Sequence, residues 1–163
     1  MTAAFCSTTD DVGKGTDAAS TFFLPLLALD IGTRHIGVAV CDRLGISAHG
    51  IVCLQRKDSG WPQRVLKLIA EYGCRGIIIG LPKNMDGSEG SQAADCRDAA
   101  GKLAALSRLP ICFQDERLST WSAKQRLREQ GLSAKKAAAR VDQTAAAIIL
   151  EDFLAAHPGA ADA

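Results

Sequence analysis

Three strand-like segments follow one another closely near the start of the chain, and this succession limits the possible folds more than any other feature. Apolar residues dominate 25–31, 35–41 and 47–54, and short polar breaks that contain glycine separate them. Breaks of this length cannot hold a crossover helix. The three strands are therefore expected to pair as antiparallel hairpins.

After residue 55 the pattern changes to helices that alternate with short strands. Apolar residues at helical spacing predict helices at 61–72, 91–106, 119–130 and 134–156. The last of these is one long helix or two broken ones. Short apolar strands are predicted at 76–80 and 110–114. Strands joined by helices pair in parallel, so both strands are expected to extend the sheet in that way.

The resulting order, βββαβαβαα, predicts an α/β fold in which a mixed five-stranded sheet carries helices on its faces. One domain is expected at 22–156, because 163 residues are enough for a single real core. Residues 1–21 and 157–163 are expected to be tails, the first of them disordered, because they offer little apolar surface. Gly73 is expected to end the helix at 61–72, and Ser91 to cap the next helix.

Charge and composition narrow the classes of function. The net charge is +1, so binding to nucleic acid would need a local basic patch. Aromatic residues are 5% of the chain, and base stacking is not expected to dominate such binding. The apolar run 22–31 is too short to span a membrane and follows no basic segment. A cytoplasmic protein without a membrane partner is expected.

The six cysteines do not form a C-x-x-C pair, so a zinc site is not expected. Four of them lie in or beside apolar runs, where they are expected to be reduced and buried. These four are Cys41, Cys53, Cys74 and Cys112.

Acidic residues stand at the ends of two strand-like runs. Asp30 ends the first run, where it either binds a metal ion or bonds to local amides of a hairpin turn. Asp115 and Glu116 follow the run 110–114. Adjacent strand residues point to opposite faces, so only one of them can face a given site if the strand continues. The other interpretation is a charged helix entry that Ser119 caps.

A further aspartate lies on an apolar helical face. At helical spacing Asp142 shares a face with Ala145, Ala146, Ile149 and Phe153, and this face is expected to pack on the sheet. Asp142 is then carried inward. A buried aspartate needs a cation, either a metal ion or a nearby arginine.

The glycine-rich loop 80–90 follows a buried strand and precedes a helix. Ligands of α/β sheets bind at such carboxyl ends of strands. Lys83, Asn84 and Ser88 are candidates for phosphate contacts. The alternative interpretation is a solvated connection without a ligand.

Taken together, these segments resemble the YqgF family, also called RuvX, whose members are described as pre-16S rRNA nucleases or Holliday junction resolvases. The resemblance covers residues 25–155, and four segments carry it: ALDIGTRHIGVAVCD, IIIGLPKNMDGSEGSQA, DERLST and VDQTAAAIIL. It implies a ribonuclease H-like fold and a catalytic, metal-binding set of Asp30, Glu116 and Asp142. The chain departs from the family at Arg34-His35, where Lys-Arg is usual.

The chemistry of three carboxylates agrees with the resemblance. Oxygen ligands favour Mg²⁺ or Mn²⁺, and two such ions would support hydrolysis of a phosphodiester bond. Arg34, Lys83 and Arg117 are expected to hold phosphate oxygens of the substrate. The resemblance favours precursor 16S rRNA as the substrate, with an association with the ribosome, and leaves branched DNA as the alternative.

Two other classes of protein compete with a nuclease. The segment 30–33 also resembles the first phosphate loop of actin-like ATPases and sugar kinases, but those proteins need a second domain for which this chain has no room. A non-catalytic binding module would have no need of three carboxylates. The sequence shows no clear dimer face, so a monomer or a weak homodimer is expected.

Overall fold

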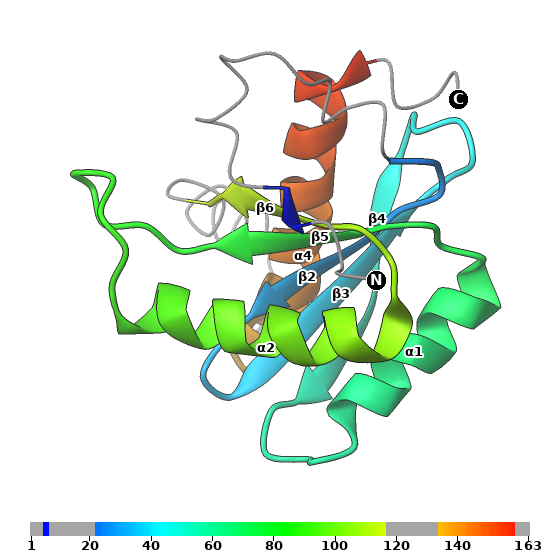
Figure 1. Ribbon diagram of the computed structural model, residues 1–163. Coiled ribbons are helices and arrows are strands. Elements are labelled where there is room, and N and C mark those ends of the chain that lie inside the picture. Colours follow the sequence, from blue (N-terminus) through cyan, green and yellow to red (C-terminus); the bar gives the residue numbers. More distant parts are fainter. Residues whose placement is uncertain (1–4, 7–21, 117–133, 159–163) are drawn as a thin grey trace.

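A mixed sheet of six strands forms the centre of the protein, and helices cover both of its faces (Figure 1). The computed structural model describes residues 5–6, 22–116 and 134–158, and for 5–6 and 134–143 it describes the backbone alone. The strands are β1 (Phe5–Cys6), β2 (Leu27–Ile31), β3 (His35–Cys41), β4 (Ala48–Gln55), β5 (Ile77–Leu81) and β6 (Ile111–Asp115). The helices are α1 (Trp61–Tyr72), α2 (Ser91–Ser107) and α4 (Ala134–Ala156).

The five predicted strands and their directions are confirmed. The order across the sheet is β1-β6-β5-β2-β3-β4, with β2, β3 and β4 antiparallel and β5 and β6 parallel to β2. The sixth strand, β1, lies within the segment that the sequence predicts to be a tail. It pairs in parallel with the outer edge of β6, which would otherwise expose unpaired backbone groups.

The helices agree with the sequence pattern, with one correction. Gly73 ends α1 in the left-handed conformation at φ 65°, as predicted. Helix α4 is one continuous helix. Ser91 is wrong as the cap of α2: it is already the first helical residue, and Gly90 precedes it without a side-chain cap. The helix predicted at 119–130 lies outside the described residues, and no helix in the described ranges is long and apolar enough to cross a membrane.

Alternation along the strands divides the core into two layers. The layer under α1 and α2 contains Leu29, Ile79 and Phe113. The layer under α4, on the opposite face in Figure 1, contains Ala28 of β2 and the residues in register with it along β5 and β6, Ile78 and Cys112. A residue that lies two or four positions from one of these core residues along the same strand therefore points to the same face of the sheet.

The packing of α4 fixes its direction across the sheet. Near its end, Phe153 meets Phe22 edge-to-face at 5.6 Å between ring centroids. A Cβ added at Gly76, just before β5, would lie 2.8 Å from a ring atom of Phe22. At the other end of β5, a Cβ on Gly80 would lie 2.5 Å from Cδ1 of Ile149. Helix α4 thus runs antiparallel to β5, and its earlier turns lead toward the carboxyl edge of the sheet.

Phe153→Ala should destabilise the protein by about 3–5 kcal/mol, because the ring of Phe153 extends from α4 and is fully buried against Phe22. Leu106→Ala on α2 is the matched control, since Leu106 is 49% exposed and its loss should cost no more than about 0.5 kcal/mol. Urea unfolding measures both. Equal losses in the two variants would contradict the packing described for α4.

Candidate active site

Strand alternation brings Asp30 and Glu116 to the face that α4 covers. Asp30 lies two residues after Ala28 in β2, and Ala28 belongs to the core layer under α4. Glu116 lies four residues after Cys112 and follows β6 directly, with Gln114 between them on the same face. The two strands flank β5, so both carboxyl groups lie near its carboxyl end.

The chain remains strand-like through Glu116, whose backbone amide donates a hydrogen bond to the carbonyl of Leu81 at 3.4 Å. This pairing settles the question that the sequence left open at Asp115-Glu116. Glu116 takes the face of Asp30, and it does so as an extension of β6.

The side chains of Asp30 and Glu116 share a hydrogen bond. Burial, followed by the negative charge of Asp30, that hydrogen bond and the charge of Asp115, raises the pKa of Glu116 to about 8. A hydrogen bond between two carboxyl groups requires a proton on one of them. The metal-free pair therefore holds one proton at neutral pH.

Gly80 makes room for this pair. It stands at the carboxyl end of β5, between the strands that carry the two acids, in register with Gln114. A Cβ on Gly80 would overlap Oε2 of Glu116 and would also press against Ile149. This role of Gly80 was not among the predictions from the sequence. The signal for it is a glycine that interrupts the buried run Ile77–Leu81, since a glycine inside a strand often marks a close approach.

The donor atoms suit a divalent cation. Oε1 of Gln114 and Oε2 of Glu116 are buried, and neither has a hydrogen-bond partner in the described part of the chain. Together with Asp30 they offer carboxylate and amide oxygens, which Mg²⁺ and Mn²⁺ prefer. A cation would also relieve the repulsion between the two acids. Over the same residues, no cluster of three His, Cys, Asp or Glu side chains is present.

The third predicted acid, Asp142, belongs to α4. It stands seven residues, or about 10 Å of helix, before Ile149, on the turns that lead toward the carboxyl edge. Its side chain lies outside the described residues. The apolar face predicted for this helix is confirmed, because four of its residues are fully buried: Ala145, Ala146, Ile149 and Phe153.

Two of the three predicted phosphate-binding residues lie in the described part of the chain, and one lies outside it. Arg34 is exposed in the turn after β2, and Lys83 is half-buried in the loop after β5. Because β2 and β5 are parallel neighbours, both residues follow strands that end at the same edge as the acids. Arg117 lies outside the described residues. Arg56, which no motif marks, donates a hydrogen bond to the turn after Asp30, and Asp95 in turn binds Arg56.

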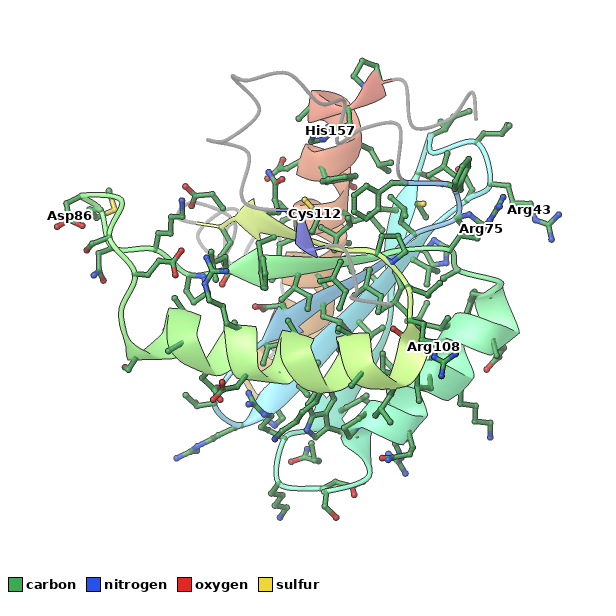
Figure 2. All side chains as sticks on the ribbon, in the orientation of Figure 1. Arg43, Arg75, Asp86, Arg108, Cys112 and His157 are labelled. Atoms are coloured by element: carbon green, nitrogen blue, oxygen red, sulfur yellow. The ribbon has the colours of Figure 1, made fainter. Side chains whose placement is uncertain are left out.

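Many polar groups of the loop 82–90 form hydrogen bonds with one another. The backbone amide of Asn84 donates to the carbonyl of Ser88 at 2.8 Å, and the Ser88 hydroxyl donates to Asp86 at 2.6 Å. The Asn84 amide group also donates to the Ser88 hydroxyl at 2.9 Å. Figure 2 shows Asp86 at the far end of this loop, away from the sheet. Asn84 and Ser88 thus stabilise the loop, and Lys83 is the better candidate for a phosphate contact.

The described cysteines have free thiols, as expected, and the expected burial is confirmed for Cys41, Cys74 and Cys112 but not for Cys53. Five have free thiols, and all of these are buried except Cys53, which is half-buried. Cys96 donates its thiol hydrogen to the carbonyl of Ile31 at 3.6 Å, close to the acids. Burial and the nearby charges of Glu116, Asp95 and Asp30 raise the pKa of this thiol to about 12, so it stays protonated.

One solved structure supports the fold. RuvC of T. thermophilus, in complex with a Holliday junction substrate, matches with a TM-score of 0.50 over 84% of this chain and 97% of that chain. The two chains are 15% identical, so the likeness shows a shared ribonuclease H-like fold alone.

Sequence comparison identifies close relatives. A Synechococcus elongatus protein named "Putative pre-16S rRNA nuclease" is 40% identical over 78% of this chain and 87% of its own length. A Paracoccus denitrificans protein of the same name is 44% identical over 77% of this chain and 80% of its own. The sequence pattern of the RuvX family, described as "Holliday junction resolvase", matches residues 25–156. The chain therefore belongs to the RuvX family.

Proposed function

We propose that this protein is a nuclease that hydrolyses phosphodiester bonds with divalent cations, Mg²⁺ or Mn²⁺, held by Asp30, Glu116 and Asp142. The buried pair of Asp30 and Glu116 carries the proposal. Two acids that share a proton beside an unpartnered buried oxygen destabilise a fold, and a cation between them removes that cost. The position of the pair, at the carboxyl edge of the sheet, is where α/β proteins bind ligands.

The chain's own residues divide the work of the reaction. When bound, a divalent cation would activate water and stabilise the charge on the leaving oxygen. Asp30 and Glu116 would release their shared proton to solvent and offer carboxylate oxygens on the α4 face to hold the cation. Arg34 and Lys83, after the neighbouring strands, orient phosphate oxygens by charge-assisted hydrogen bonds.

Precursor 16S rRNA is the proposed substrate. Relatives that are 40% and 44% identical over most of their length carry this substrate in their names. The proposed activity belongs to the cytoplasm, in association with ribosome assembly, and the free thiols of the described cysteines agree with a reducing compartment.

A second candidate is the resolution of branched DNA, which the description of the matching family favours. Two cuts at one junction would require two sites, and therefore a dimer. The two functions separate in one experiment, in which the protein and Mg²⁺ are incubated with precursor 16S rRNA and, side by side, with a synthetic four-way junction. Cleavage of the RNA alone supports the first function, and symmetric cleavage of the junction alone supports the second.

Asp30→Asn, Glu116→Gln and Asp142→Asn should each lower the rate of hydrolysis by about a hundredfold or more, because each removes a charge that holds the cation. Each change keeps the size of the side chain. Glu71→Gln, an equal change on the exposed surface of α1, is the control and should leave the rate unchanged. The measurement is single-turnover cleavage of the preferred substrate. Near-normal turnover in one of the three variants would remove that residue from the site.

The stability of the metal-free protein should fall as pH rises from about 4.5 to about 8. Glu116 loses its proton near 4.5 when unfolded but only near 8 when folded, so between these values the unfolded chain binds fewer protons. A rise in pH then favours unfolding. Urea unfolding in a chelator, compared between wild type and Glu116→Gln, isolates this contribution. The variant should lose less stability across the interval, and identical pH profiles would contradict the raised pKa.

A further inference from the structure

We propose that Arg56 and Asp95 are positioning residues, which hold the turn after Asp30 and thereby place the Asp30 carboxyl group for binding the cation. The inference rests on the proposed function, because it concerns the same site. It adds two residues that lie outside every motif of the sequence analysis and come from separate elements, just after β4 and within α2.

The turn that joins β2 to β3 is tight and leaves a carbonyl for an outside donor. The amide of Gly32 donates to the carbonyl of His35 at 2.9 Å. A Cβ on Gly32 would lie 3.0 Å from that same carbonyl oxygen, so the backbone here allows little displacement. The carbonyl oxygen of Gly32, two residues after Asp30, accepts its hydrogen bond from Arg56.

Arg56 is fixed by several contacts at once. Its Nη1 donates to the Gly32 carbonyl at 3.0 Å, and its backbone amide donates to the carbonyl of Arg34 at 2.8 Å. The guanidinium carbon lies 5.9 Å from the centroid of the Trp61 ring, and the side chain is only 17% exposed. Arg56 therefore binds both sides of the turn, with little freedom of its own.

Asp95 orients the guanidinium from α2. Its Oδ1 accepts from Nη2 of Arg56 at 2.7 Å, and its Oδ2 accepts from Nη1 at 3.0 Å. The next residue, Cys96, donates to the carbonyl of Ile31. Helix α2 thus holds two consecutive carbonyls of the turn, one directly and one through Arg56. A bidentate contact of this kind depends on the planar fork of arginine, which lysine cannot reproduce.

The Arg56–Asp95 pair and the Asp30 carboxyl group lie on opposite faces of the sheet. Trp61 and Cys96 belong to the core layer under α1 and α2, whereas Asp30 points to the face of α4. Arg56 therefore acts on Asp30 through the backbone of the turn. Its charge is also offset by Asp95, so its effect on the acid is mainly one of geometry.

The test is calorimetric titration with Mn²⁺ alone, in the absence of nucleic acid, on the full chain. Arg56→Lys and Asp95→Asn should each weaken the affinity for Mn²⁺ by about tenfold or more, as losses of outer contacts to metal ligands do. The double variant should be no weaker than the weaker single variant, because both residues act through one contact. Asp95→Asn keeps its shape at a partly exposed position, and it serves the test if Arg56→Lys does not fold.

The chain supplies a closely matched control. Arg97, also on α2, makes a bidentate ion pair with Glu89 at 2.6 and 2.8 Å and stands 4.8 Å from the centroid of the Phe113 ring. In the described part of the chain, no hydrogen bond, ion pair or ring contact joins it to the turn after Asp30. Arg97→Lys removes the same kind of interaction at a more exposed position, since the Arg97 side chain is 43% exposed and that of Arg56 17%. It should therefore lower the unfolding free energy by less than Arg56→Lys, while leaving the affinity for Mn²⁺ unchanged.

Each outcome separates the positioning role from the proposed function. If wild type and both Arg56 and Asp95 variants bind Mn²⁺ equally well, the positioning role is overturned and the proposed function stands. A loss of RNA affinity with unchanged Mn²⁺ affinity would also overturn it, and would make Arg56 a substrate contact. If wild type itself does not bind Mn²⁺, the proposed function fails and the positioning role fails with it.

Discussion

The approach of two carboxyl groups, Asp30 and Glu116, is the constraint on which the rest of the site depends. Two acids in a poorly solvated place repel each other, and here they remain together by sharing a proton, which the raised pKa of Glu116 reflects. The surrounding structure is arranged for that contact. Gly80 has no side chain where one would overlap Glu116 and would also press against Ile149 of α4. A fold that needed only stability would have apolar groups here.

The two faces of the sheet have different tasks. The face under α4 holds the acids, and strong apolar packing farther along the helix, around Phe153 and Phe22, keeps α4 against the sheet despite them. The face under α1 and α2 holds the turn after Asp30, through Arg56 and Asp95. Asp30 is thus positioned by Arg56 and Asp95 from the opposite face of the sheet, through the backbone of the turn. Outer contacts of this kind are a common means of orienting metal ligands.

Much of the fold was predictable because the relevant signals are local. Short glycine-containing breaks predicted the antiparallel pairing of β2, β3 and β4, and helices between strands predicted the parallel pairing of β5 and β6. Helical spacing predicted the buried face of α4 on which Ala145, Ala146, Ile149 and Phe153 lie. The position of Asp30 at the end of a strand was also evident. Each of these depends on the order of residues within one element, which the sequence states directly.

The sequence by itself determined the elements, their order and the candidate acids, and the tertiary structure decided how they meet. The residues alone allowed Glu116 to be either the end of a strand or the entry to a helix. Only the hydrogen bond from its backbone amide to the carbonyl of Leu81 assigned it to the face of Asp30. The contacts of Arg56 with Gly32 and Asp95 could not be predicted from the sequence for the same reason. Arg56 lies 24 residues from Gly32 and 39 from Asp95, and no local pattern relates them. Periodicity records how neighbours along the chain share a face, whereas contacts between distant residues exist only once the sheet and helices have packed together.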